Sequence, residues 1–417
     1  MNLGLISLIV LFAAIILGFL RNINVGILSI GFAMVLGLIY GISGKELISG
    51  FSSSLFLQMT GITYMFAVLS GNGTLSNLAN RMVGLVGKRT YLIPFVMYIM
   101  GYVICAVGPG AIPSLAIIPV IAVPIAISAG INPVMLSLVG QVGVQSGRMS
   151  PLTPEALVVQ ELMAAQGIEV NTVTIGWCLL VTEFLLLVAI YVYYKGWRVD
   201  PNHKETEREL KPFDKSQLVS LAGLIILLVG VLFFSWNVGL AGFLIGSVLV
   251  ILGAGDEKKS VQAVPWNVIL MVLGVGILMN IITSSGGIDI LVAGLEKLMT
   301  PKTATPILAV ASGIMSFFSS GLGVVFPTLI PTTGGLAAGL GINPVELCAA
   351  VVVGGTITGY SPISTAGALI MAAVSQEKEA EKKHPQNKMF VELFGVAFAG
   401  LFILALVTAA GVFGILC

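Results

Sequence analysis

The pentapeptide Gly-Ile-Asn-Pro-Val occurs twice in this chain, at Gly130–Val134 and at Gly341–Val345, 211 residues apart. The segments that follow also match: residues 142–152 have the sequence VGVQSGRMSPL, and residues 353–363 have the sequence VGGTITGYSPI. In each copy a long apolar stretch is interrupted by glycine, by hydroxyl residues and by a Ser-Pro step. The match indicates a duplicated unit, and in a membrane protein such a unit points to a substrate site.

The composition predicts a membrane protein. Of 417 residues, 57% are hydrophobic and only 9% are charged, which is far too few charges for the surface of a soluble protein of this length. Apolar runs recur along the chain, and many reach the ~20 residues that cross a bilayer as a helix. The predicted fold class is therefore an all-α polytopic membrane protein. A net charge of +1 gives no indication of a nucleic-acid partner.

Each half of the chain shows the same series of segments. Predicted spans lie near residues 2–20, 26–43, 54–70, 174–194, 217–235, 238–254, 264–284 and 390–413. Two longer apolar stretches, 131–166 and 342–375, contain the interruptions and predict broken helices. Segments 91–128 and 305–340 each turn back around a glycine-rich tip, VGPGAIP at 107–113 and SSGLGVVFP at 319–327, and predict re-entrant hairpins.

The halves are predicted to be repeats of opposite orientation, residues 1–194 and 217–417, joined by a charged linker at 195–216. Each half crosses the membrane five times, and five is odd. With the linker in the cytoplasm, 16 of the 20 basic residues fall on that side, and only Lys45, Lys297 and Lys302 fall outside. Arg148 belongs to neither side. We therefore expect a multi-pass protein of the cell (inner) membrane with both termini outside.

Two further segments, 75–88 and 288–299, are moderately amphipathic and predict interfacial arm helices, unless they only extend their neighbours. The sequence gives little support to an enzyme. The only histidines, His203 and His384, lie in charged loops, and the four aspartates lie in loops or at an arm. No cofactor is expected beyond a coupling ion.

The interruptions are where a solute is expected to bind. Breaking a helix at membrane depth frees carbonyl groups, which together with Ser and Thr hydroxyls suit a small cation. It also exposes helix N-termini, whose N–H groups and dipole attract anions. Four such elements occur in two matched pairs: the hairpin tips 107–111 and 319–323, and the breaks 143–153 and 354–365. Matched interruptions of this kind are the best pointer to the site of a secondary transporter.

Arg148 is the most informative single residue, because it lies in the first break and aligns with Gly359 in the second. An arginine at this depth costs several kcal/mol, so it must face a cavity or a partner. It could hold a carboxylate through two parallel hydrogen bonds. The alternative is a structural ion pair with Glu155, which could also carry a coupling proton.

The pattern resembles the ion transporter superfamily, in particular the divalent anion:sodium symporters and the MatC-like dicarboxylate (malonate) carrier permeases. The resemblance covers nearly the whole chain: repeats, hairpins, broken helices and arms. The symporters carry Ser-Asn-Thr at each hairpin tip and a Gly-Thr-Pro-Pro-like step at each break. Here Ser319-Ser320-Gly321 and Gly108-Pro109-Gly110 stand at the tips, and Ser150-Pro151 and Ser361-Pro362 at the breaks.

The resemblance implies a homodimer with an elevator mechanism, in which hairpins and broken helices carry the substrate past fixed spans. It implies two sodium sites, each between a tip and a break, and a substrate site between the tips. The implied ion ligands are Gly108, Gly110, Gly143 and Ser146 in the first half, and Ser319, Gly323, Thr356 and Thr358 in the second. The implied substrate contacts are Ser150, Pro151, Ser320, Ser361 and Pro362, to which the sequence adds Arg148.

The leading hypothesis is cation-coupled symport of a small organic anion, such as a C4-dicarboxylate or malonate, with sodium as the expected cation and a proton as the alternative. A second hypothesis is a cation/proton antiporter or an exporter of inorganic oxyanions with the same architecture. An anion channel is a third hypothesis, but it needs a continuous pore, whereas two opposed hairpins are typical of gates. An intramembrane enzyme is the weakest of the four.

Overall fold

The structure, a computed structural model, describes residues 3–21, 23–75, 77–78, 81, 90–197, 212–234, 236–318, 320–362 and 364–417. Helices make up its secondary structure, and the described ranges contain no β-strand. By length and composition, seven helical stretches within these ranges can cross a membrane, and shorter apolar helices accompany them. The predicted all-α polytopic membrane protein is confirmed.

The same order of elements occurs in both halves. The first half contains α1 (Leu3–Arg21), α2 (Val25–Tyr40), α3 (Gly44–Ile48), α4 (Ser53–Gly71), η1 (Thr90–Leu92), α6 (Ile93–Ala106), α7 (Ala111–Ala129), α8 (Pro133–Ser146), α9 (Pro154–Ala164) and α10 (Thr172–Tyr193). The second contains α11 (Lys215–Phe234), α12 (Val238–Ile251), α13 (Glu257–Ala263), α14 (Trp266–Ser284), α15 (Gly287–Glu296), α16 (Ala304–Phe318), η2 (Gly321–Val325), α17 (Phe326–Leu329), η3 (Ile330–Thr332), α18 (Thr333–Leu340), α19 (Pro344–Ile357), η4 (Thr358–Tyr360), α20 (Thr365–Gln376), α21 (Lys378–Lys383), α22 (Gln386–Ala409) and α23 (Val412–Leu416).

All eight predicted simple spans correspond to helices, with ends that differ by a few residues. The predicted hairpins are α6–α7 and α16 to α18, and the predicted broken helices are α8–α9 and α19–α20. The predicted second arm corresponds to α15, and its position at the membrane interface stays a prediction. Most of the first arm, and residues 198–211 of the linker, lie outside the described residues. The opposite membrane orientation of the halves stays a prediction.

The repeated pentapeptide joins a hairpin to a broken helix in both halves. Gly130 and Gly341 end α7 and α18 in the left-handed conformation, at φ of 65° and 68°, which glycine adopts without strain. Asn132 and Asn343 then cap α8 and α19, and their Oδ1 atoms accept hydrogen bonds of 2.9 Å from the amides of Val134 and Val345. Proline is the first residue of each helix, where it needs no amide partner. The pentapeptide is thus a helix junction.

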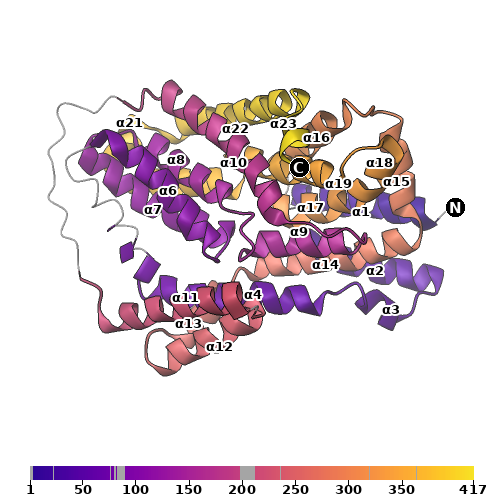
Figure 1. The fold of residues 1–417 in the computed structure, drawn as a ribbon, viewed down its shortest axis with the longest axis horizontal. Helices are drawn as coiled ribbons and strands as arrows, with labels where there is room; N and C mark the ends of the chain where they lie inside the picture. Colours follow the sequence, from indigo (N-terminus) through magenta and orange to yellow (C-terminus); the bar gives the residue numbers. More distant parts are fainter. Residues whose placement is uncertain are drawn as a thin grey trace.

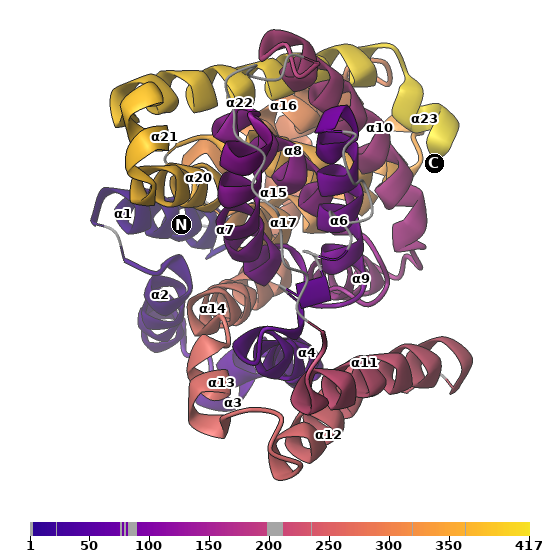
Figure 2. The same ribbon diagram turned by 90° about the vertical axis from the view of Figure 1, so that its left-hand side faces the viewer.

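Figure 1 shows the helices in two layers. The lower layer contains α2, α3, α4, α11, α12, α13 and α14, which are the early elements of both halves. The upper layer contains α6 to α10 together with α16 to α23. Figure 2 shows the same separation from the side, with α22 at the top and α12 at the bottom. Each layer therefore combines elements from both halves of the chain.

Two helix pairs in the lower layer are matched between the halves, α2 with α14 and α12 with α4. Both pairs approach backbone to backbone at glycine. A Cβ atom on Gly26 of α2 would overlap the carbonyl oxygen of Leu270, and one on Gly61 of α4 would overlap that of Gly239. Small residues permit such contact in membranes, where no hydrophobic effect drives helices together. We name these two contacts the glycine seams.

The seam at Gly26 can be tested with a control on the same helix. A Cβ on Gly31 of α2 would meet nothing within 4 Å. We expect Gly26→Leu to destabilise the purified protein by at least the ~1–3 kcal/mol of an overpacked core, because α2 and α14 must separate. Gly31→Leu should unfold at the temperature of the unsubstituted protein. Equal melting temperatures for the two variants would contradict the seam.

Candidate functional site

The two breaks between helices are closed by matched hydroxyl groups. In the first, Thr153 Oγ1 donates to the carbonyl oxygens of Arg148 and Ser150. In the second, Ser364 Oγ donates in the same way to the carbonyls of Gly359 and Ser361. Each donor lies five residues after its first acceptor and three residues after its second. The hydroxyls thus satisfy carbonyls that the ends of α8 and η4 leave without helical partners.

The breaks are shorter than the sequence indicates. They were predicted at 143–153 and 354–365, but α8 continues to Ser146 and α19 to Ile357. The reason is close packing in both cases. A Cβ on Gly143 would overlap the carbonyl oxygen of Tyr98 in α6, and one on Gly354 would lie against α16. These glycines let helices approach each other and do not interrupt them.

The tip of the first hairpin holds a carboxylate of the chain itself. Glu155, at the start of α9, accepts a hydrogen bond of 2.8 Å at Oε1 from the amide of Ala111, the first residue of α7. A Cβ on Gly110 would lie 2.5 Å from Glu155 Oε2, and Gly110 has a φ of 76°. Only glycine suits this position. The positive end of α7 is therefore neutralised by Glu155.

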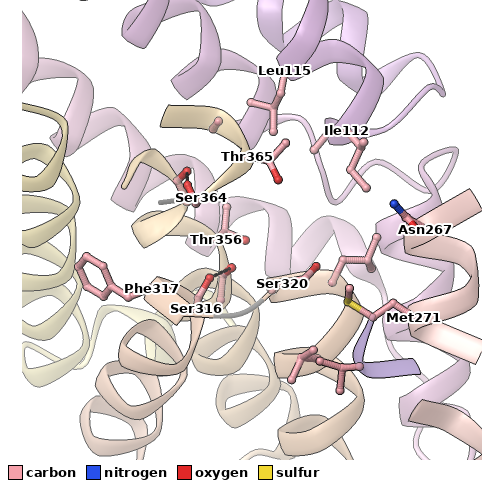
Figure 3. Close-up of a pocket in the computed structure, with 18 of the residues that line it drawn as sticks. Ile112, Leu115, Asn267, Met271, Ser316, Phe317, Ser320, Thr356, Ser364 and Thr365 are labelled. Carbon is pink, nitrogen blue, oxygen red and sulfur yellow. Dashed lines mark hydrogen bonds between the residues drawn. The ribbon is translucent and has the colours of Figure 1, made fainter. Parts of the chain in front are cut away.

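A cavity of about 510 Å³ lies between the two layers. Its walls come from the α1–α2 junction and α14 on one side, and from α7, both breaks and the second hairpin tip on the other. The lining residues are Ile15, Gly18, Ile23, Asn24, Val25, Ala111, Ile112, Leu115, Gln145, Arg148, Asn267, Met271, Ser316, Phe317, Ser320, Gly321, Leu322, Val324, Gly355, Thr356, Gly359, Ser364, Thr365 and Ala366. In Figure 3, Thr356, Ser364, Thr365 and Ser320 surround a space that Asn267 and Met271 close from the side of α14.

Arg148 is the charged residue among those that line this cavity. Its side chain is only 7% exposed, and Nη1 donates to Thr356 Oγ1 at 3.1 Å. Nη2 lies 3.8 Å from Glu155 Oε1, and the guanidinium carbon lies 5.8 Å from the centre of the Phe326 ring. The Nη2 distance is too long for a good hydrogen bond. The ion pair with Glu155, one of the two predicted alternatives, therefore exists, but it leaves Arg148 with further donor capacity.

Three buried polar atoms around the first break have no hydrogen-bond partner: Arg148 Nε, Gln145 Oε1 and Glu155 Oε2. Gln145 donates only a long bond of 3.5 Å from Nε2 to the carbonyl of Thr356. Buried polar groups in proteins almost always have partners, so each exception needs an explanation. Two of the three residues, Arg148 and Gln145, line the cavity. A polar ligand there is the simplest explanation.

The duplicated positions meet at the cavity but differ in charge. With the 211-residue offset of the repeat, Gln145 matches Thr356, and these two residues contact each other. Ala111 matches Leu322, and Glu155 matches Ala366; both second-half residues line the cavity. At the first tip the carboxylate of Glu155 bonds to the amide of Ala111. At the second tip the residue that matches Glu155 is Ala366, which carries no charge. The second tip presents its helix N-terminus to the cavity without an acidic side chain.

Three of the predicted site residues meet at the cavity: Arg148, Ser320 and Thr356. Ser320 caps the second tip, because its Oγ accepts from the amide of Gly323 at 3.0 Å. Thr356 Oγ1 also donates to the carbonyl of Val352 at 2.7 Å. Ser319 lies outside the described residues.

The other predicted substrate residues belong to the breaks and are not among the lining residues. Ser150 Oγ donates to the carbonyl of Ala106 at 2.6 Å and so ties the first break to the end of α6. Pro151 is exposed. Ser361 and Pro362 are buried, and the Ser361 carbonyl is an acceptor for Ser364.

Most predicted ion ligands also have structural contacts. Gly108 has a φ of 146° and packs against Phe66, and Gly110 faces Glu155. Ser146 Oγ donates to the carbonyl of Val142 and accepts from the hydroxyl of Tyr98 at 3.1 Å. Thr358 Oγ1 donates to the carbonyl of Gly313 at 3.0 Å.

Sequence reasoning missed several polar residues of the cavity wall. Asn24 and Asn267 come from the lower layer, and their contact, Asn24 Nδ2 to the carbonyl of Asn267 at 2.7 Å, joins residues 243 apart. No local pattern indicates such a contact. Gln145 was inside the quoted repeat, and its match with Thr356 was a signal that could have been used.

The first 148 residues match the family model described as "Dicarboxylate carrier protein MatC N-terminus". No curated protein matches this sequence. Among solved structures, the chain is similar to the YdaH transporter of Alcanivorax borkumensis, with a TM-score of 0.60 at 13% identity over 90% of this chain and 88% of that one. It is also similar to MtrF of Neisseria gonorrhoeae, described within a class of antimetabolite efflux pumps, with a TM-score of 0.57 at 15% identity over 90% and 84%. The predicted resemblance to MatC-like carriers is confirmed over residues 1–148, and the chain is a multi-pass membrane protein with the fold of transporters.

Proposed function

We propose that this protein is a secondary active transporter that carries a small dicarboxylate, such as malonate or a C4-dicarboxylate, together with a cation. The observation that carries the proposal is the charge of the cavity. Arg148 supplies a buried positive charge, and no Asp or Glu is among the lining residues. A buried arginine with unused donor capacity favours a carboxylate, which it binds through charge-assisted hydrogen bonds.

The two halves suggest where each carboxylate of the substrate binds. In the first half, Glu155 shows how a carboxylate binds at a hairpin tip, with the Ala111 amide as its donor. The matching position in the second half is bordered by Leu322 and Ala366 and belongs to the cavity. We propose that one substrate carboxylate occupies that position and the other contacts Arg148. The match of the first 148 residues to dicarboxylate carriers supports a substrate with two carboxylates.

The position of the cavity supports an elevator mechanism. Asn24, Asn267 and Met271 belong to the lower layer or its edge, whereas Arg148, Ser320 and Thr356 belong to the upper layer. Displacement of one layer against the other would move the polar wall relative to Asn267 and open the cavity to one side. The homodimer and the sodium sites implied by the resemblance remain predictions.

The function is tested directly in proteoliposomes. We expect uptake of labelled malonate or succinate to be driven by an inward sodium or proton gradient and to be inhibited by an excess of the same unlabelled dicarboxylate. Equal loading without any gradient, or currents far above carrier turnover, would contradict secondary active transport. A monocarboxylate such as acetate serves as the control solute.

Arg148 can be tested without removing its charge. Arg148→Lys keeps the positive partner of Glu155 but loses the planar fork of donors, so we expect dicarboxylate affinity to fall at least tenfold. Lys388→Arg, at the surface ion pair with Glu392, is the matched control and should bind as the unsubstituted protein does. Unchanged affinity in Arg148→Lys would remove Arg148 from the proposed site.

Two glutamines on α8 provide a second comparison. Gln145 lines the cavity, whereas Gln141, one turn earlier, donates to the carbonyls of Leu115 and Ala366 inside the protein. We expect Gln145→Leu to weaken dicarboxylate binding several-fold, equivalent to the ~1 kcal/mol of a hydrogen bond. Gln141→Leu should lower the melting temperature and leave the affinity unchanged. The reverse pattern would place the ligand elsewhere.

A further inference from the structure

The Arg148–Glu155 pair contains a carboxylate that can bind a proton. A proton is a cation that can be coupled to transport without a metal-ion site. Their side chains are only 7% and 1% exposed, and an Arg148 nitrogen lies 3.8 Å from a Glu155 oxygen. Glu155 Oε1 is held by the Ala111 amide, while Oε2 has no hydrogen-bond partner. A neutral carboxylic acid has one O–H donor and an acceptor oxygen, so Glu155 can keep the Ala111 bond in either protonation state.

We propose that Glu155 carries the coupling proton of the transporter and competes with the substrate carboxylate for Arg148. This inference rests on the proposed function of the cavity. A proton from the solvent binds to Glu155, which becomes neutral, and Arg148 then pairs with the incoming carboxylate. No covalent bond other than this O–H bond forms or breaks.

The charge of the buried site supports this exchange. Before binding, Arg148 and Glu155 sum to zero. After binding, Arg148 pairs with one substrate carboxylate and protonated Glu155 is neutral, so the sum is zero again. The second carboxylate faces the second hairpin tip, where Ser320 is polar and no acidic side chain is among the lining residues. Without proton uptake, two carboxylates and Glu155 would face a single arginine in a medium that disfavours unpaired charge.

The surroundings of Glu155 favour such a role. Arg148 acts on Glu155 electrostatically, and Glu155 in turn acts on Cys105 of α6. On α10, Glu183 lies beyond Arg148, and its Oε2 accepts a hydrogen bond of 2.8 Å from Tyr360. Ala111 and Arg148, which bond to and pair with Glu155, line the cavity, so Glu155 lies next to residues of the cavity wall.

The test is isothermal titration calorimetry of the purified full chain with malonate and succinate between pH 6 and pH 8. Titrations in two buffers with different heats of ionisation count the protons taken up. The unsubstituted protein should take up about one proton per dicarboxylate and bind more weakly as the pH rises. Glu155→Gln should bind without this proton and with an affinity that no longer falls with pH; protons that the substrate itself exchanges appear equally in both proteins.

Glu183→Gln is the control, because Glu183 is equally buried and also has an oxygen without a partner. It should keep the proton uptake of the unsubstituted protein. Dicarboxylate binding that takes up no proton, or that requires sodium instead, would overturn the role of Glu155 and leave the proposed function intact. Absence of binding at every pH, with and without sodium, would overturn both. If Glu155→Gln does not fold, the proton count of the unsubstituted protein decides alone.

Discussion

A peptide group at membrane depth has no water to bond with, and this constraint governs the centre of the molecule. Both broken helices satisfy it with one hydroxyl placed five residues after the first carbonyl that it bonds, Thr153 in the first half and Ser364 in the second. Because short side chains close the breaks locally, the remaining polar groups are free to face the cavity. The hydroxyl that follows each Ser-Pro step thus allows an irregular backbone to exist beside the cavity.

The same constraint explains the difference between the two hairpin tips. An exposed helix N-terminus needs an anion or another acceptor, and α7 has one in Glu155. At the second tip, Ser320 supplies a neutral oxygen to Gly323, and the neighbouring position borders the cavity. At matched positions the two halves carry glutamate at 155 and alanine at 366, so only the first tip holds a carboxylate of the chain.

Much of the fold could be predicted from the sequence. Apolar runs indicate the spans, and Gly and Pro interruptions of these runs indicate the hairpins and the breaks. The site followed only in part. Arg148 was identifiable, since a charge at that depth has few structural explanations, and its pairing with Glu155 was one of the expected alternatives. Gly108, Gly110 and Gly143 were assigned to ions because the resemblance implies an ion site between each tip and its neighbouring break. Their observed contacts, with Phe66, Glu155 and Tyr98, are made with other elements and leave no local pattern. The same is true of Asn267, which reaches the cavity only through the pairing of α2 with α14.

The glycine seams have a mechanical consequence. Contacts between long side chains can adapt by changing rotamers when one helix slides past another, but a backbone-to-backbone contact has no such freedom. We therefore expect the pairs α2–α14 and α4–α12 to resist shear, so that the lower layer moves as one stiff plate. Any large displacement within a single chain has to occur between this plate and the layer above it, at the level of the cavity.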